Sequence, residues 1–289
     1  MPSDTTRRKR QLGRFMESIR KRHEPAMLPE ALADAVETSR ATISRMENGL
    51  QVPNKHLFIA ILGALGANTE ERFEALLLWT HAKQSTVRIE HATDFPPEYV
   101  AFRRDETQAL AELTIDYTTL PGLLQTADYA RAVAEASRLL GGHDSAWSER
   151  AGEERAARQR LLLREDPLRL HALVSEAALH LRVGGPEVMA EQFEHLLAMV
   201  ELENVTFQVV PFRAGAFGPM NGPLVILEFD NDAESPYSVY LEYPTGGKTV
   251  EREPDVSSFT TLFGAVRELA VSEEETVRLV RAELEKTGS

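Results

Sequence analysis

The stretch E-T-S-R-A-T-I-S-R-M-E-N-G, residues 37–49, decides the fold of the N-terminal part of this chain. Read as a helix capped by Ser39, with 100° per residue, it places Ile43 and Met46 on an inner side. The predicted outer face consists of Ser39, Arg40, Ala41, Thr42, Ser44 and Arg45. Because several of these side chains are small, the helix backbone can lie close to another surface. Such a face suits the major groove of DNA, which is about 12 Å wide.

The preceding run, P-E-A-L-A-D-A-V at residues 29–36, predicts a second short helix. Its Ala31, Leu32, Ala35 and Val36 form an inner face, and only Glu37 and Thr38 separate it from Ser39. Two short helices joined by a tight turn make a helix-turn-helix. The alternative is an ordinary pair of packed helices.

This region resembles the Cro and phage-repressor family of DNA-binding domains. The resemblance covers about residues 8–66 and rests on the pattern I-S-x-x-E-x-G, present as Ile43, Ser44, Glu47 and Gly49. It implies a structural ion pair between Glu47 and a basic residue at the end of the first helix, where Arg22 stands.

The sequence departs from that family pattern at two positions. Glu37 replaces the usual glycine of the turn, and a left-handed conformation there would cost roughly 1 kcal/mol or more. Pro29 replaces a Gln that often contacts phosphate, and proline has neither an amide hydrogen nor a polar side chain. One phosphate contact is therefore expected to be missing.

Charge is divided unevenly along the 289 residues. The net charge is −13, but residues 1–86 carry +3 and the remainder carries −16. Basic residues cluster around the first predicted helix, as phosphate-neutralising residues do: Arg7, Arg8, Lys9, Arg10, Arg14, Arg20, Lys21 and Arg22. Residues 1–9 are predicted to form a flexible basic arm in which Arg8 and Lys9 contact DNA. A solvated helix face is the alternative.

Composition indicates an ordinary globular protein of two units with no membrane span and no signal peptide, which we expect in the cytoplasm. The absence of Cys removes disulfides and Cys-based zinc sites. Common phosphate-binding, hydrolase and zinc-protease motifs are absent from the sequence, and His171, His180 and His195 are too scattered to suggest a metal site. We assign no catalytic residue, metal or cofactor, and expect no enzyme.

The first unit, residues 1–86, is predicted to be a five-helix helix-turn-helix domain. Its first helix carries the stripe Leu12, Phe15, Met16 and Ile19, and its fourth carries Leu57, Phe58, Ile61, Leu62 and Leu65. In its fifth helix Phe73, Leu76, Leu77 and Thr80 form the predicted inner stripe. Leu78 and Trp79 lie off that stripe, and we favour packing within the unit over contact with the second unit or another subunit.

The second unit, residues 95–289, is predicted to be a larger α+β domain with a small mixed or antiparallel sheet flanked by helices. Strands are expected over 113–120, 170–174, 205–211, 223–229 and 237–243. Helices are expected over about 99–110, from about 126, over 145–164, 186–202 and 256–269, and after the capping box of Ser272 and Glu275.

This second unit also resembles a known domain. L-P-G-L-L-Q-T-A-D-Y-A at 120–130, S-E-A-A-L at 175–179, V-G-G-P at 183–186 and N-V-T-F-Q-V-V-P-F at 204–212 are similar to the uncharacterised domain of WhiJ-like actinobacterial regulators. The resemblance implies a transcriptional regulator paired with a small protein encoded nearby, in an antitoxin-like arrangement.

Two further surfaces of this unit are candidates for binding. One is a glycine-rich loop with aromatic residues, whose candidate ligand or partner residues are Phe212, Gly215, Phe217, Gly218 and Asn221. A plain hairpin connection is the alternative. The other is Leu120–Gln125, which is either an exposed apolar surface or part of the core.

These observations favour a sequence-specific regulator that binds double-stranded operator DNA as a homodimer. One short helix reads only a few base pairs, so two heads are needed. The fifth helix around Trp79 and the last helix with Val277, Val280 and Leu284 are the candidate dimer contacts. The alternatives are a regulator that senses a small molecule and an enzyme with a DNA-binding head.

Overall fold

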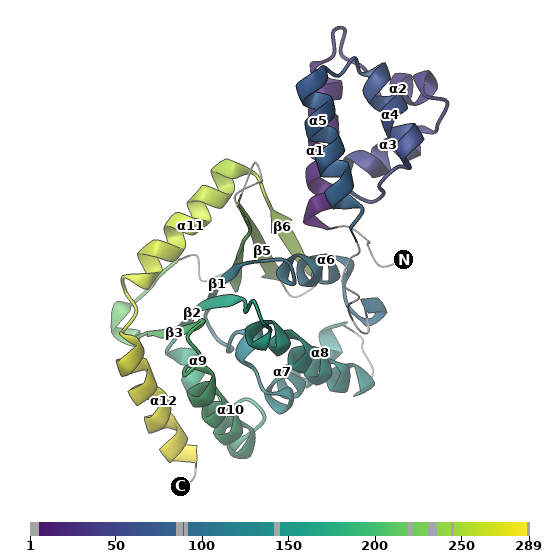
Figure 1. Ribbon diagram of the computed structural model, residues 1–289. Coiled ribbons are helices and arrows are strands. Elements are labelled where there is room, and N and C mark those ends of the chain that lie inside the picture. Colours follow the sequence, from purple (N-terminus) through teal and green to yellow (C-terminus); the bar gives the residue numbers. More distant parts are fainter. Residues whose placement is uncertain are drawn as a thin grey trace. The chain divides into compact units, whose positions relative to one another are not determined.

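The computed structural model describes residues 6–84, 89, 92–141, 145–218, 222–230, 236–243 and 246–287 (Figure 1). The chain divides into two compact units, Met1–Asp105 and Glu106–Ser289. The predicted fold class is confirmed: a helical helix-turn-helix region precedes an α+β domain with a mixed sheet flanked by helices. The candidate Asn221 lies outside the described residues.

The first unit consists of short helices packed around one apolar cluster. Leu12 and Met16 of the first helix, Leu32 of the second, Ile43 of the third and Phe58 of the fourth are buried in this cluster. The helices are α1 (Arg7–Arg22), α2 (Pro29–Ala35), α3 (Arg40–Glu47), α4 (Lys55–Ala64) and α5 (Thr69–Ala82), followed by η1 (Ala92–Asp94) and α6 (Pro97–Glu106).

The inner face of α5 differs from the prediction. Ala75 and Ala82 are buried, and Leu78 and Trp79 pack against the same core, whereas Phe73, Leu76 and Leu77 are exposed. α5 carries apolar residues around much of its circumference, so periodicity alone could not choose the stripe. The two alanines let α5 lie close beside α1. The prediction that Leu78 and Trp79 pack within the first unit is confirmed.

Trp79 explains why that side faces inward. Its ring stacks on Phe58 with 5.9 Å between ring centroids, and its Nε1–H donates to the carbonyl of Pro53 at 2.9 Å. A buried indole needs a partner for its single donor, and this side of α5 supplies one.

The second unit is built on six strands in the order β3-β2-β1-β4-β5-β6. The first three pair in parallel and the last three add antiparallel. The strands are β1 (Ala111–Asp116), β2 (Arg169–Ser175), β3 (Val205–Val210), β4 (Leu224–Glu228), β5 (Tyr237–Tyr243) and β6 (Gly246–Val250). The helices are η2 (Gly122–Leu124), α7 (Ala127–Gly141), α8 (Ser145–Leu163), α9 (Ala177–His180), α10 (Pro186–Met199), η3 (Phe212–Ala214), α11 (Glu253–Arg267) and α12 (Glu273–Thr287).

Strand β6 and helix α9 were not predicted. β6 begins with two glycines, which sequence rules assign to a turn. Gly247 nevertheless belongs in the strand, because a Cβ there would lie 2.1 Å from the hydroxyl oxygen of Tyr240 on β5. α9 has only four residues and is too short to give a periodic pattern.

The two faces of β1 have different chemistry. Ile115 and Tyr117 join an apolar cluster with Val256 and Phe263 of α11. Glu112, Thr114 and Asp116 alternate with them, so they lie on the opposite face, and all three are buried. The sequence was interpreted there only as a strand, and this buried polar row was missed.

Arg158 of α8 balances part of the negative charge beside this buried polar row. Arg158 donates from Nη2 to Glu106 Oε1 at 2.5 Å, and the same nitrogen lies 3.8 Å from Glu112 Oε1. Thr114 donates from its hydroxyl to Asp116 Oδ2 at 2.6 Å. Burial raises the pKa of Asp116 to about 7; the Thr114 hydrogen bond and the positive charges of Arg158 and Arg155 oppose this, and Glu242 adds to it.

The raised pKa of Asp116 predicts a pH-dependent stability of the second unit. Between pH 4 and 7 the folded unit keeps a proton that the unfolded chain has released, so the free energy of unfolding should fall as pH rises through this window. Asp116→Asn should remove that fall and stabilise the unit at pH 8. Denaturant titrations from pH 4 to 8 measure it, with the exposed Asp128→Asn as the control. Parallel pH profiles for wild type and Asp116→Asn would contradict the assignment.

Candidate nucleic-acid interface

Helix α3 begins and packs as its sequence predicts. The Ser39 hydroxyl accepts a hydrogen bond from the Thr42 amide at 3.1 Å, which caps the first turn. Ile43 and Met46 are buried in the core of the first unit. The predicted inner face is therefore confirmed, and the opposite side of the helix is directed away from that core.

The outward side chains of α3 have different degrees of exposure. Ser39, Arg40, Ala41 and Arg45 are exposed, whereas Thr42 and Ser44 are half-buried. Arg40 Nε lies 2.8 Å from Glu30 Oε1 in α2, but both side chains are more than half exposed. An exposed pair of this kind contributes little to stability, so the Arg40 guanidinium can exchange Glu30 for a phosphate or a base edge at small cost.

The turn between α2 and α3 adopts a left-handed conformation at Glu37, whose φ is +52°. The amide of Thr38 donates to the carbonyl of Ala33, and the amide of Glu37 donates to that of Asp34. This pattern is a Schellman motif, which favours glycine at the position of Glu37. The turn thus keeps its ordinary shape and bears the conformational cost of a non-glycine residue.

Glycine allows α1 to contact the end of α3 directly. A Cβ on Gly13 would lie 2.3 Å from the carbonyl oxygen of Glu47 and 2.7 Å from that of Met46. Any larger side chain would therefore push α3 away from α1. Gly49, with φ of +68°, makes a similarly close approach to the backbone of Arg10.

Glu47 forms the predicted kind of ion pair, but its partner is Arg20 and the expectation of Arg22 was wrong. Arg20 Nε and Nη2 donate to the two carboxylate oxygens of Glu47 at 2.5 and 2.9 Å, and Nη1 donates to the carbonyl of Met27 at 2.9 Å. Arg20 shares a helix face with Gly13 and Met16, whereas Arg22 is turned 200° away from it. Arg22 instead pairs with Glu71 of α5.

The hydrogen bonds that Arg20 donates to Glu47, and the negative charge of that carboxylate, raise the pKa of Arg20 against the opposing effect of burial. Both side chains are more than nine-tenths buried. The pair therefore has a fixed geometry and serves as a structural link between α1 and α3.

The predicted basic arm differs in the structure. Residues 7–9 form the first turn of α1, capped by Thr6, so the prediction of a flexible arm was wrong for them, and residues 1–5 lie outside the described part. Arg8 donates to the side chain of Gln84, and Lys9 is 9% exposed. Both side chains would have to leave these positions to reach phosphate.

Helix α2 begins without a polar side chain at its first residue or at its N-cap. Pro29 is the first residue of α2, and Leu28 precedes it as the N-cap. Neither side chain has a polar atom, so neither can bind phosphate.

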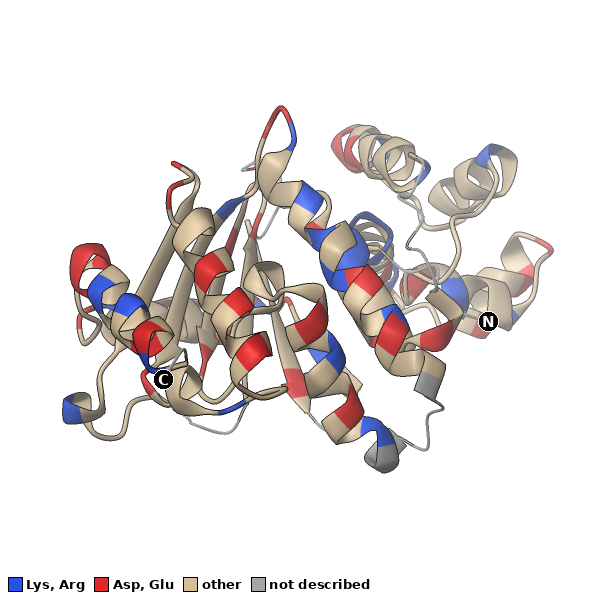
Figure 2. Cartoon of the chain, turned by 90° about the horizontal axis from the view of Figure 1, so that it is seen from below, with Lys and Arg blue, Asp and Glu red and all other residues tan. Residues whose placement is uncertain are grey.

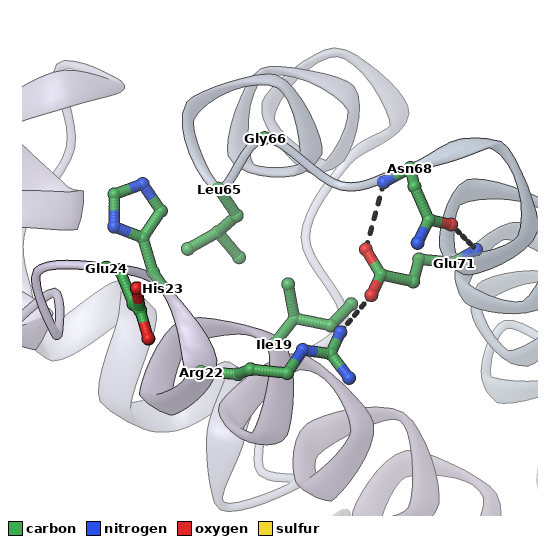
Figure 3. Close-up of a pocket in the computed structure, with 8 residues that line it drawn as sticks. All are labelled: Ile19, Arg22, His23, Glu24, Leu65, Gly66, Asn68 and Glu71. Atoms are coloured by element: carbon green, nitrogen blue, oxygen red, sulfur yellow. Dashed lines mark hydrogen bonds and ion pairs between the residues drawn. The ribbon is translucent and has the colours of Figure 1, made fainter.

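A shallow hollow of about 360 Å³ lies in the first unit between the end of α1 and the start of α5 (Figure 3). Arg22 and Glu71 pair across it, and Glu71 also accepts from the Asn68 amide in a capping box. His23 Nδ1 lies 2.9 Å from the Pro25 carbonyl. These polar groups are used in holding the helices together, so their arrangement does not indicate a ligand site.

The glycine-rich loop of the second unit has both inward and outward residues. Phe217 is buried and stacks on Tyr117, and Gly218 packs against the Tyr117 hydroxyl, where a Cβ would be 2.8 Å away. Gly215 has φ of +70°. Phe212 is 59% exposed and stacks on His180, and its amide donates to Glu176 at 2.7 Å. Of the described candidates, Gly215 and Gly218 are exposed as well, and Phe212 is the one that presents a large apolar side chain to solvent.

The segment Leu120–Gln125 belongs to the core. Leu120, Leu123 and Leu124 are buried, so it is not an exposed apolar surface. Its backbone is held by side chains of other helices: Gln192 of α10 donates to the Leu124 carbonyl at 2.7 Å, and Gln159 of α8 donates to that of Gln125 at 2.7 Å.

The three histidines of this unit have separate partners. His171 lies 2.8 Å from Gln208, His195 lies 3.0 Å from Gln159, and His180 lies between Glu176 and Glu283. Burial lowers the pKa of His171 and of His195, so both are neutral at pH 7. These contacts account for the histidines structurally.

Charge is mixed over the second unit. Figure 2 shows acidic and basic positions interspersed along its helices. None of the described helices combines the length and apolarity that crossing a membrane requires.

A short capped helix that exposes Arg40, Ala41 and Arg45, joined to a preceding short helix by a tight turn, is the arrangement of a helix-turn-helix protein. In agreement, residues 11–76 match the family described as a helix-turn-helix domain. The chain therefore carries a helix-turn-helix domain, which supports a role as a DNA-binding regulator. Residues 99–282, more than half of it, match the family described as Domain of unknown function (DUF5753), and the chain belongs to that family. No curated protein matches the chain.

The strained turn predicts that Glu37→Gly stabilises the first unit by roughly 1 kcal/mol, because glycine adopts positive φ without a steric cost. Ala60→Gly, at an exposed position in the middle of α4, should instead destabilise it by about 1 kcal/mol. Thermal unfolding of the full chain measures both. A loss of stability for Glu37→Gly as large as that for Ala60→Gly would contradict the prediction.

Proposed function

We propose that the chain is a sequence-specific transcriptional regulator that inserts α3 into the major groove of operator DNA. The observation that carries this proposal is the exposed face of α3, on which Arg40 and Arg45 flank the small Ala41. Arginine donates two hydrogen bonds to the edge of guanine, and a helix with small residues on its outer face can approach the bases closely. Ser39, Thr42 and Ser44 complete the proposed contact surface.

The proposed regulator binds DNA as a homodimer. A single α3 spans eight residues and reaches few base pairs. Two heads on half-sites one helical turn apart, roughly 34 Å, double the sequence that is read. Arg8 would add a phosphate contact after leaving Gln84, and Lys9 after leaving its buried position. These contacts would not depend on sequence.

We further propose that the DUF5753 domain receives a small protein partner, in an antitoxin-like arrangement, and that it has no catalytic activity. The sequence resemblance to WhiJ-like regulators supports this role. Phe212 supports the place: it is an exposed aromatic side chain held by stacking on His180 and by its backbone bond to Glu176. Rigid exposed aromatics are frequent anchors in protein interfaces.

One observation favours a second candidate function, the sensing of a small molecule by this domain. Glu112, Thr114 and Asp116 form a buried polar row, and buried polar clusters with a perturbed pKa are common at ligand sites. Against it, Phe217 and Gly218 pack on Tyr117, and Arg158 already lies against two carboxylates. We therefore favour the partner-controlled regulator.

Arg45→Ala tests the proposed reading of DNA. If Arg45 contacts a base edge, the variant should lose roughly 1–3 kcal/mol of binding free energy on the preferred site and should tolerate other bases at one position. Selection from a random DNA library followed by titration at fixed salt measures both effects. Arg278→Ala, which removes an equally exposed arginine from α12, is the matched control.

Three outcomes are distinguishable. A loss confined to the preferred site supports base reading by Arg45. An equal loss on every sequence would assign Arg45 to phosphate. Absence of any selected sequence with the wild-type chain would overturn the proposed function itself.

A further inference from the structure

Helix α5 presents an apolar stripe to solvent. Phe73, Leu76 and Leu77 are 67%, 36% and 46% exposed in the complete chain. They stand at positions i, i+3 and i+4, so they form one continuous strip over two turns of the helix. Isolated exposed apolar residues are ordinary, but a contiguous set on one helix face marks a contact surface.

The stripe is not a by-product of weak packing in the head. The opposite side of α5 is fully used, with Ala75 and Ala82 buried and Trp79 stacked on Phe58 and bonded to Pro53. Rotating α5 to bury Phe73 would expose Trp79 and break its hydrogen bond. The exposed stripe is therefore a fixed property of this fold.

Charges beside the stripe fit a second copy of the same helix. Exposed Glu70 and Glu74 stand in its first half, and exposed His81 and Lys83 stand at its end. Two copies packed antiparallel place the acidic half of each beside the basic end of the other, whereas a parallel pair would bring like charges together. A surface that complements itself under a two-fold axis is what a symmetric dimer requires.

The register of such a pair follows from the helix geometry. Glu74 and His81 are seven residues apart, so they lie on the same edge of the stripe. With the two-fold axis beside Leu77, Glu74 of one copy faces His81 of the other. Leu77 of each copy then meets that of its partner at the centre, and Phe73 lies about one turn further along, beside Thr80 of the second copy.

The other surfaces considered from the sequence are used within the chain. Trp79 belongs to the core of the head. Val280 of α12 is buried, and α12 packs against α10 and β3 of its own unit.

We propose that two chains pair through antiparallel α5 helices, with Phe73, Leu76 and Leu77 forming the contact. This inference rests on the proposed function, because it says how two heads are joined on one operator. α5 is about 21 Å long, and a single helix pair buries less than the roughly 1,600 Å² of a standard stable interface. The contact is weak alone and acts when DNA holds both heads together.

The experiment compares the full-length wild-type chain with Phe73→Glu/Leu77→Glu and with the control Leu163→Glu, which adds charge at an equally exposed leucine of α8. Binding is titrated on the selected palindrome and on a single half-site. Wild type and control should bind the palindrome cooperatively. The α5 variant should lose affinity for it by tenfold or more, because the central Leu77 contact and the flanking Phe73 contacts are lost, and should keep its affinity for the half-site.

Charge exchange tests the antiparallel register separately. His81→Glu alone should weaken cooperative binding, because it sets the new carboxylate against Glu74 of the second copy. The double variant Glu74→Lys/His81→Glu should restore it. Circular dichroism confirms that each variant folds, which is expected since all four positions are exposed.

The possible failures are separable. If the wild-type chain selects no DNA sequence, the proposed function fails and the pairing fails with it. If the wild-type chain binds a palindrome cooperatively and Phe73→Glu/Leu77→Glu binds it equally well, the α5 contact is overturned while the regulator function stands. A failure of the double charge variant to recover cooperativity would overturn the antiparallel register.

Discussion

The ion pair between Arg20 and Glu47 holds the helix on which DNA binding depends. α3 has eight residues and buries only Ile43 and Met46 completely, and a free helix of that length is not stable in water. Gly13 brings α1 against the carbonyls at the end of α3, and the bidentate pair then fixes its rotation. Removing one partner of such a buried pair leaves the other charge uncompensated, at a cost of about 3–5 kcal/mol. Orientation of the exposed Arg40 and Arg45 thus depends on Gly13, Arg20 and Glu47, which act through contacts between α1 and α3.

Local signals made the head predictable. The Ser39 cap, the spacing of Ile43 and Met46, and the short turn each act within a few residues, so the sequence alone locates α3 and its outward face. Prediction failed where a choice depended on distant atoms. Arg20 and Arg22 are both basic and both near the end of α1, and only the position of α3 shows which one reaches Glu47. Two sides of α5 are apolar, and the side with Trp79 faces the core because the Trp79 Nε1–H donates to the carbonyl of Pro53 there.

In the second unit, too, local patterns located the strands, whereas contacts between distant residues were not predicted. Strands rich in β-branched and aromatic residues were located within a few residues, and β5 matches its prediction at both ends. The contacts that define the interior join residues far apart in sequence: Glu106 with Arg158, and the Thr126 amide with Gln192. No spacing rule connects such positions, so the sequence could not indicate that the polar face of β1 is buried. A strand with Glu112, Thr114 and Asp116 is typical of a half-solvated sheet, and burial of all three needs the arginines of α8 beside it.

Ion pairs within the first unit reduce the number of cations that are available to neutralise DNA phosphates. The cluster of basic residues along α1 indicates many phosphate contacts, yet Arg20, Lys21 and Arg22 are paired with Glu47, Glu17 and Glu71. Affinity for DNA rises with the number of phosphates that a protein neutralises, and cations engaged in internal pairs add little to that number. A single head therefore gains little from non-specific attraction. In the regulator that we propose, specific contacts by Arg40 and Arg45 and the joining of two heads would supply most of the binding free energy.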